Sequence, residues 1–323
     1  MFKQIKGFSA LLAMSILPLG LASAAGNAVP GAVNYVEGQV SVAGQPVTPS
    51  AIGSVQLQPG QVIETGPGRA EVLLTPGVFL RLGDNSSLRL ISPNLGDTRV
   101  ELLKGRAIVE VTEIFKDNNL RVMLAGSSAR LDKEGLYSFD ADARQVRVFD
   151  GEASVQTNDR EVNVKKDHQL ALAAPFKTAH FDARAQSAQD PLYAWSNLRS
   201  EYEAQASMQS ARNIFVGGGS YWAGPGWYWN PYWSMYGFIP ADGIWFSPFG
   251  WPFYSPWVVY SAPGYGYGFR GYGLRGNGFV VGARHVGAGA MASHAGFGGT
   301  GGGFAGHGFA GGMRGGFGGG GRH

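Results

Sequence analysis

The sequence offers few residue patterns that could carry out catalysis. It contains no cysteine and no Gly-x-Ser-x-Gly run that would place a nucleophilic serine on a strained turn. Asp140 and Asp142 stand two apart and would point to one face of a strand, where paired carboxylates could act on a glycosidic bond. Because aspartates at strand ends are usually solvated, we interpret both as solvent-facing. We therefore expect no catalytic residue and a protein that is not an enzyme.

Histidine is the other residue type that could bind a ligand, here a metal ion. His168 and His180 each stand alone in the first half of the chain. Four more are irregularly spaced among glycines near the C-terminus, without cysteine or acidic residues beside them: His285, His294, His307 and His323. We predict no metal site and no cofactor.

A block of residues 214–283 that is dense in aromatic residues, proline and glycine is the one feature that predicts binding. It contains seven of the eight tryptophans, which we name as candidate binding residues: Trp222, Trp227, Trp229, Trp233, Trp245, Trp251 and Trp257. Its prolines and glycines suit neither a helix nor a regular strand. Two roles remain open, namely packing against the rest of the chain or a second copy, and a surface for a glycan, a membrane interface or a partner protein.

The residues before this block are predicted to form an all-β domain over residues 33–173. Aliphatic residues alternate there with charged ones, as where Leu80 and Leu82 flank Arg81, and turn sequences interrupt the runs at short intervals. Such alternation puts the aliphatic residues in the core and Arg81 on the solvent face. We expect a sandwich, a jelly roll or a short β-solenoid.

One amphipathic helix is predicted over residues 190–213. Asp190 can cap it and Pro191 suits its first turn. Apolar residues then recur at spacings of three and four: Leu192, Trp195, Leu198 and Tyr202. Its charged residues, Arg199, Glu201 and Glu203, are expected mostly on the solvent side.

The two ends of the chain are predicted to lie outside any folded core. Residues 1–24 resemble an export signal, because Lys3 and Lys6 precede a short apolar run that ends in small residues, and we predict cleavage between Ala24 and Ala25. An uncleaved anchor is the alternative. Residues 284–323 are glycine-rich. Ordering them would cost on the order of 40 to 80 kcal/mol of backbone conformational entropy, while burying their few large apolar side chains would return only about 15 to 20 kcal/mol, so we predict disorder.

The formal charge of +3 is small and no basic patch stands out in the β-region, so we predict no nucleic-acid partner. With an export signal, the protein is expected in the periplasm or at the cell surface.

The β-region resembles the FecR family of periplasmic sensor domains. The matching elements, in order, are Gly38-Gln39-Val40, residues 60–74 (G-Q-V-I-E-T-G-P-G-R-A-E-V-L-L), residues 77–82, residues 87–90, residues 103–107 and residues 146–155. That family shows a G-x-V opening, a glycine before an I-x-T strand, then G-x-A-x-V-x-L and G-x-x-L-x-L. The resemblance covers roughly residues 33–172.

The resemblance implies a binding or sensor role, as in regulators that carry a cytoplasmic anti-sigma segment, a membrane span and this domain outside. Only about six residues precede Gly7, so we expect no sigma-binding segment here. We predict a non-enzymatic binding, scaffold or sensor module for an envelope protein or polysaccharide, with membrane-interface or self-association through the aromatic block as further options. The alternatives are a carbohydrate-binding or polysaccharide-processing envelope protein and a membrane-tethered regulator with an uncleaved anchor.

Overall fold

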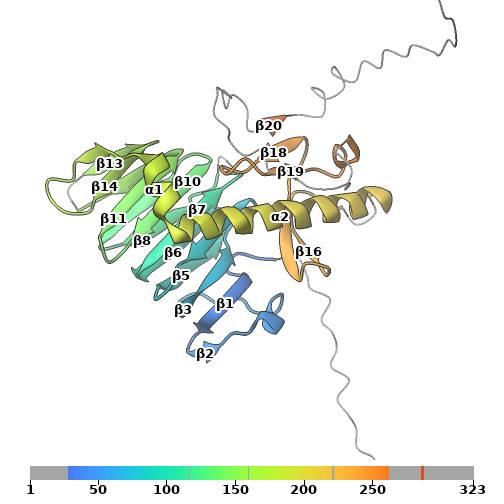
Figure 1. Ribbon diagram of the computed structural model, residues 1–323, viewed down its shortest axis with the longest axis horizontal. Coiled ribbons are helices and arrows are strands. Elements are labelled where there is room, and N and C mark those ends of the chain that lie inside the picture. Colours follow the sequence, from blue (N-terminus) through green and yellow to red (C-terminus); the bar gives the residue numbers. More distant parts are fainter. Residues whose placement is uncertain (1–27, 116, 159, 220–221, 262–284, 287–323) are drawn as a thin grey trace, which may run out of the picture. The chain divides into compact units, whose positions relative to one another are not determined.

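The computed structural model describes residues 28–115, 117–158, 160–219, 222–261 and 285–286 (Figure 1). The predicted leader with its cleavage between Ala24 and Ala25 lies outside these residues. So does the predicted disordered segment, except for residues 285–286. All described residues belong to one compact unit.

Fifteen strands between residues 33 and 180 form one sheet, which confirms the predicted all-β domain. The strands are β1 (Val33–Val42), β2 (Gln45–Pro46), β3 (Val62–Leu73), β4 (Val78–Leu82), β5 (Ser87–Asn94), β6 (Asp97–Lys104), β7 (Arg106–Val111), β8 (Arg121–Leu124), β9 (Ser127–Leu131), β10 (Gly135–Asp140), β11 (Gln145–Asp150), β12 (Glu152–Gln156), β13 (Glu161–Lys165), β14 (His168–Ala171) and β15 (Thr178–His180). Neighbouring strands are antiparallel except for β6 and β8, which run parallel. The main path runs β13-β12-β9-β8-β6-β5-β3-β4-β7-β10-β11-β14-β15. The sheet curls so far that it is nearly closed.

The inner face of the curled sheet carries the main hydrophobic core. Alternate aliphatic residues from successive strands point into it and are fully buried, among them Leu80, Val100, Val122, Val148 and Leu170. These are positions that the period-two pattern assigns to the core.

Glycines join consecutive strands that do not pair with each other at two of the positions that the family resemblance identified. Gly105, between β6 and β7, has φ 72°, and a Cβ there would lie 2.3 Å from the Ser86 hydroxyl oxygen. Gly151, between β11 and β12, has φ 97°, and a Cβ there would lie 2.2 Å from the Tyr137 hydroxyl oxygen. Both positions therefore require glycine for space as well as for backbone conformation.

The outer face of β3, β4 and β7 is buried too, which corrects the prediction for Arg81. Its side chain is fully buried rather than solvated, as are Glu71 and Glu110 on the neighbouring strands. Phe79 and Leu73 lie on the same face. Alternation correctly assigned Arg81 to the face opposite the core, but it carried no information about what covers that face.

Two helices follow the sheet, α1 (Ala183–Gln189) and α2 (Pro191–Val216). α2 begins where Asp190 and Pro191 predicted, with the Asp190 carboxylate accepting hydrogen bonds from the backbone N–H groups of Leu192 and Tyr193. The shorter α1, capped by Asp182, was not predicted. None of the helices in the described part of the chain combines the length and apolar composition needed to cross a membrane.

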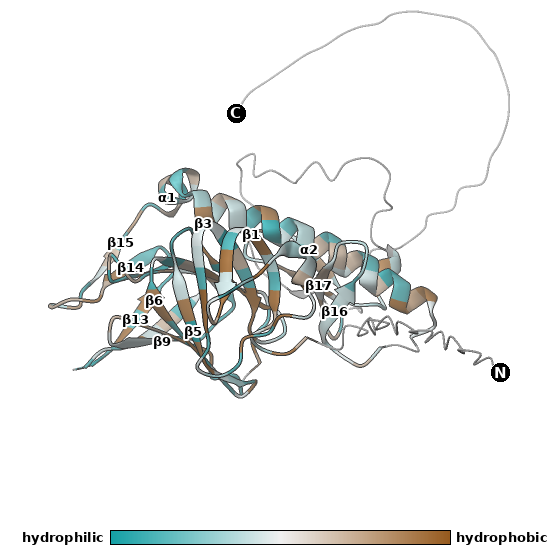
Figure 2. Cartoon of the chain, turned by 90° about the horizontal axis from the view of Figure 1, so that it is seen from below, coloured by the Kyte–Doolittle hydropathy of each residue, from teal (hydrophilic) through white to brown (hydrophobic). Residues whose placement is uncertain are grey.

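The orientation of α2 differs from the predicted amphipathic arrangement. Arg199 and Glu203 are buried rather than solvated, while Leu198 and Tyr202 are exposed. The physical reason is that α2 contacts the sheet and the strands of the aromatic block as well, so polar and apolar residues around it are enclosed together. Figure 2 accordingly shows hydrophilic and hydrophobic residues mixed around the helix.

The aromatic block forms short strands, contrary to the prediction that no regular strand would suit it. They are β16 (Gly226–Asn230), β17 (Met235–Ile239), β18 (Ile244–Phe246) and β19 (Pro252–Tyr254), followed by a 3-10 turn at Val259–Ser261; another 3-10 turn lies far from the block, at Pro49–Ala51. Beyond the block, β20 (His285–Val286) pairs with β18, which corrects the prediction of disorder for these two residues. β16 and β17 form a hairpin, and its turn places Ser234 at φ 49°. Pairing satisfies the backbone of these strands, and their rings pack against α2 and the sheet (Figure 1).

Candidate functional site

A cluster of charged side chains is buried on the outer face of the sheet. The Arg81 guanidinium on β4 lies between two carboxylates, with its Nε 2.6 Å from Glu71 Oε2 and its Nη1 2.5 Å from Glu110 Oε2. All three side chains are fully buried. Buried charges are tolerated only when they are paired and hydrogen-bonded, and this pairing supplies both.

α2 adds a second guanidinium and a third carboxyl to this cluster. Arg199 Nη2 lies 2.9 Å from Glu71 Oε1 and 3.3 Å from Glu203 Oε1. The Ser200 hydroxyl donates to Glu110 Oε1 at 2.8 Å. The helix is thus held to the sheet by charge-assisted hydrogen bonds as well as by apolar contacts.

Asn34 of β1 joins the same cluster to the β16–β17 hairpin. Its amide nitrogen donates to Glu203 Oε1 at 2.6 Å, to Glu71 Oε1 at 3.1 Å and to the Tyr236 carbonyl at 3.1 Å. Its amide oxygen accepts from the Tyr236 backbone N–H at 2.7 Å. One asparagine therefore connects the sheet, the helix and the aromatic block.

Three carboxyls face two guanidiniums in this cluster, so one proton balances the charge. Burial opposes the ionisation of Glu71, but Arg199 and Arg81 outweigh it and hold the pKa of that carboxyl well below its usual value. Burial and the neighbouring Glu71 raise the pKa of Glu203 well above its usual value. We therefore assign the proton to Glu203. Because these groups are buried, they hold α2 on the sheet and a substrate cannot reach them.

The predicted tryptophans divide between the interior and the surface. Trp227 is buried and packs edge-on against Phe79, with the ring centroids 4.8 Å apart. The others, apart from Trp257, are half-buried: Trp222 against Tyr228, Trp229 against Tyr236, Trp233 against Tyr202, and Trp245 and Trp251 against the cluster that contains Phe79. Most of these rings therefore pack within the chain itself.

Trp257 belongs to an exposed apolar surface at the C-terminal end of α2, which we call the terminal aromatic surface: Phe215, Val216, Trp257 and Tyr260. The exposed fractions are 36%, 83%, 53% and 81%. The Phe215 and Tyr260 rings lie 5.6 Å apart, and Trp257 Cη2 lies 3.1 Å from where a Cβ on Gly219 would stand. Sequence reasoning that considered tryptophans alone missed the other three residues, although Phe215 and Val216 continue the helix pattern.

A second group of rings lies beside the middle of α2. Tyr202 and Trp233 have ring centroids 5.8 Å apart, and Tyr232 packs against Trp233 at 5.6 Å. Tyr232 is 77% exposed, and the Trp233 Nε1–H donates to Gln209 Oε1 at 3.1 Å. Rings and an amide group therefore share one exposed area.

The aspartates considered for catalysis both have partners within the chain. Asp140 is half-buried rather than solvent-facing, because it accepts a hydrogen bond from the Ala143 backbone N–H at 2.7 Å and lies 3.8 Å from the Arg106 guanidinium. Asp142 is exposed, as predicted, and accepts a hydrogen bond from the Gly105 backbone N–H at 3.2 Å. The sheet brings His168 and His180 opposite each other, although they are twelve residues apart in the chain. Among the described residues, no group of three or more histidine, cysteine, aspartate or glutamate side chains could hold a metal ion.

Part of the sheet is similar in sequence to a known protein family. Residues 61–154 match the model of the FecR protein family. Two crystal structures of proteins described as anti-sigma factors from Parabacteroides distasonis are similar at 15% and 14% identity, with TM-scores of 0.35 each, over 39% and 40% of this chain. The chain spans 62% and 65% of their lengths, which is less than two thirds. A search of the curated proteins finds no match. The residues that match the family model run from the start of β3 into β12, so this part of the sheet is similar to the FecR family.

Proposed function

We propose that the protein is an exported, envelope-associated FecR-domain protein that acts without catalysis as a binding, scaffold or sensor module for a partner protein or envelope polymer. The observation that carries the proposal is the terminal aromatic surface. While most rings of the block that the structure describes are buried or half-buried, Val216, Trp257 and Tyr260 are largely exposed near the C-terminal end of α2. Large apolar side chains that cluster at the surface mark interaction sites more often than isolated ones do.

The chemistry of this surface suits binding by shape and apolar contact. Tryptophan and tyrosine offer flat apolar faces with a polar edge, and they order at low conformational cost because each has two side-chain torsions. Such residues commonly supply most of the binding energy of an interface. The surface lies at the end of a helix that the buried charge cluster fixes, so it is presented in a defined orientation.

The proposed absence of catalysis is supported by where the perturbed groups lie. Carboxyls with strongly shifted pKa values are ordinarily the first candidates for an active site. Here Glu71 lies fully buried beneath α2, Glu203 is fully buried on α2 itself, and Glu113, whose pKa is also raised, is 5% exposed. Asp140 accepts a turn hydrogen bond from Ala143, and Asp142 accepts one from the backbone of Gly105. We accordingly expect Asp140→Ala and Asp142→Ala to leave any glycan-hydrolysis signal of the preparation unchanged.

The binding role is tested by point variants rather than by deleting residues 214–283, since the deletion would also remove Trp227 and Phe238 from the core. Trp257→Ser with Tyr260→Ser should reduce crosslinked partner recovery from envelope fractions at least fivefold. Leu95→Ser is the matched control, because Leu95 is 51% exposed on the β5–β6 hairpin. Equal recovery with the wild-type and doubly substituted chains would remove this surface from the proposal.

Export is tested separately by the N-terminal sequence of the protein recovered from fractionated cells. The proposal expects a mature chain that begins at Ala25 and is found with the periplasm or outer surface. A chain that retains residues 1–24 in the membrane fraction would instead support a membrane-tethered regulator.

Carbohydrate binding is a second candidate function, favoured by the rings of Tyr202, Tyr232 and Trp233 beside Gln209. A sugar ring can place its apolar face on an aromatic ring while an amide group hydrogen-bonds its hydroxyls. Tyr232→Ala with Trp233→Ala should then abolish retention on a glycan array. If neither the wild-type chain nor the Leu95→Ser control binds any glycan, this candidate fails while the protein-binding proposal is unaffected.

A further inference from the structure

Two histidines face each other across the strand pair β14–β15. His168 and His180 are direct cross-strand partners, with ring centroids 5.6 Å apart and ring planes at 86°. The Phe181 backbone N–H donates to the Asp167 carbonyl at 3.0 Å immediately beside them. This places the histidines at a non-hydrogen-bonded position, where cross-strand side chains approach most closely.

The hydrogen bonding of His168 defines which of its ring nitrogens can bind a ligand. Its Nδ1 lies 2.8 Å from the Lys166 carbonyl oxygen. A carbonyl oxygen only accepts, so Nδ1 carries the hydrogen in the neutral ring and Nε2 keeps a free lone pair. Metal-binding histidines are commonly held in this way, with the second ring nitrogen donating to a carbonyl or carboxylate.

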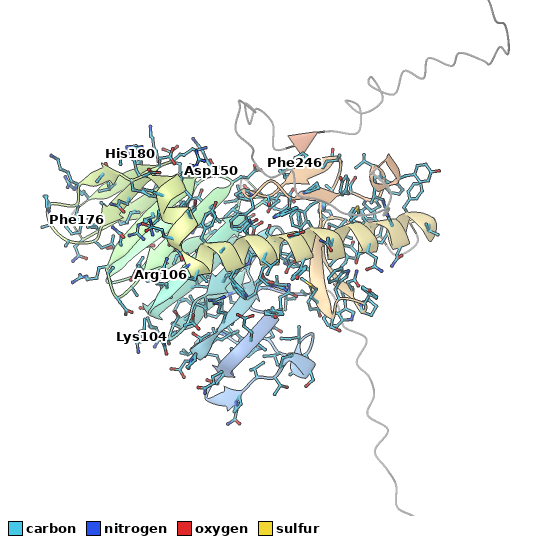
Figure 3. The ribbon with its side chains drawn as sticks, viewed as in Figure 1. Lys104, Arg106, Asp150, Phe176, His180 and Phe246 are labelled. Carbon is cyan, nitrogen blue, oxygen red and sulfur yellow. The ribbon has the colours of Figure 1, made fainter. Side chains whose placement is uncertain are left out.

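The ring of His180 can turn to meet the same ligand. It is exposed at the edge of the sheet (Figure 3), and no hydrogen bond within the described residues holds it. A metal ion lies about 2 Å from an imidazole nitrogen and therefore about 3 Å from the centre of that ring. With the present ring centres 5.6 Å apart, one ion between the rings is within reach of both.

We propose that His168 and His180 together bind one divalent ion of the late first transition row, with water completing its coordination. Two neutral imidazoles favour Cu²⁺, then Zn²⁺ or Ni²⁺, over the hard ions Mg²⁺ and Ca²⁺, which prefer oxygen ligands. With two protein ligands the ion stays exchangeable, and it links the edge strand β15 to β14. The proposal is independent of the terminal aromatic surface.

Calorimetric titration of the full mature chain with Cu²⁺, Zn²⁺ and Mg²⁺ tests the site. His168→Asn and His180→Asn should each weaken Cu²⁺ binding at this site at least tenfold, and the double variant should lose one ion per chain. The control is His307→Asn with His323→Asn, two histidines outside the described residues, which should leave that ion bound. Retention of all sites in the double variant, or loss of the ion only in the control, would overturn the proposal.

Thermal unfolding provides a second measurement that depends on both strands being linked. An ion bound to the folded chain at a hundredfold above its Kd should raise the Tm by about 5 °C. The increase should fall by about half or more in either single variant and should be absent in the double variant and with Mg²⁺. An undiminished increase in both single variants would contradict a shared site.

Discussion

Glu113, just beyond the end of β7, is buried without a compensating charge, and its removal should change how stability depends on pH. It is 5% exposed, and its Oε2 has no hydrogen-bond partner among the described residues. Burial, and then the neighbouring carboxylates of Glu134 and Asp242, raise the pKa of Glu113 from 4.5 to about 7. The folded protein therefore holds this proton at pH values where the unfolded chain has released it.

The sign and size of the effect follow from proton linkage. Between pH 4.5 and 7 the folded state binds more protons than the unfolded state, so the free energy of unfolding falls as pH rises. A shift of about 2.5 units at about 1.36 kcal/mol per unit amounts to about 3 kcal/mol. The stabilising contribution is complete below pH 4.5 and is lost by pH 7.

Glu113→Gln removes this titration while keeping the shape of the side chain. We expect the variant to equal the wild type near pH 4 and to exceed its free energy of unfolding by about 2 to 3 kcal/mol at pH 8. Urea unfolding followed by tryptophan fluorescence between pH 4 and 8.5 measures the difference. Glu161→Gln, which changes an exposed carboxyl on β13, is the control. A Glu113→Gln variant that is less stable at pH 8, or whose difference from wild type does not vary with pH, would refute the reasoning.

Three further predictions concern the packing of α2 and the aromatic block. Arg199→Met leaves Glu203 without a guanidinium and Glu71 with Arg81 alone, and it should lower the free energy of unfolding in urea by about 3 to 5 kcal/mol. A loss below about 1 kcal/mol would contradict this role. Trp227→Ala should lower the free energy of unfolding by about 3 to 5 kcal/mol because this ring is buried, whereas Trp257→Ala should lower it by less than about 0.5 kcal/mol because that ring is exposed. Equal losses would contradict this difference in burial. Asp190→Ala removes the cap of α2 and also the carboxylate that pairs with Arg106; Figure 3 shows Arg106 beside the start of α2. The substitution should lower the free energy of unfolding by about 1 to 3 kcal/mol. Asp190→Asn keeps the cap and should lower the Tm by a smaller amount; an equal loss would show that capping is not the relevant contribution.

Local patterns predicted the elements whose cause is local. Alternation identified the strands because one face of each, as with Leu80 and Leu82, points into the core. Asp190 and Pro191 marked the start of α2 because capping involves only neighbouring residues. The FecR-like order of turns and strands could likewise be read directly.

What the sequence did not reveal depends on residues far apart in the chain. The residues around Arg81 do not indicate that Arg199 and Glu203, more than a hundred residues later in the chain, contact the same carboxyl group, Glu71, and help to bury the cluster. The same limit hid the pairing of His168 with His180, although treating residues 168–180 as a hairpin could have found it. In the aromatic block, proline and glycine suggested irregular backbone, whereas apolar contacts with Phe79 stabilise short strands there.

The cover over β3, β4 and β7 has a practical consequence for anyone preparing the domain by itself. A fragment limited to the matched residues, 61–154, would lack α2 and the aromatic block, so Phe79 and the charged side chains of Glu71, Arg81 and Glu110 would be exposed to solvent. The fragment would also lack β1, the strand that pairs with β3. Such a fragment would tend to aggregate and to lose its native charge pairing. The smallest piece with a chance of independent folding begins before β1 and ends after residue 261, nearly two and a half times as long as the part by which the family is recognised.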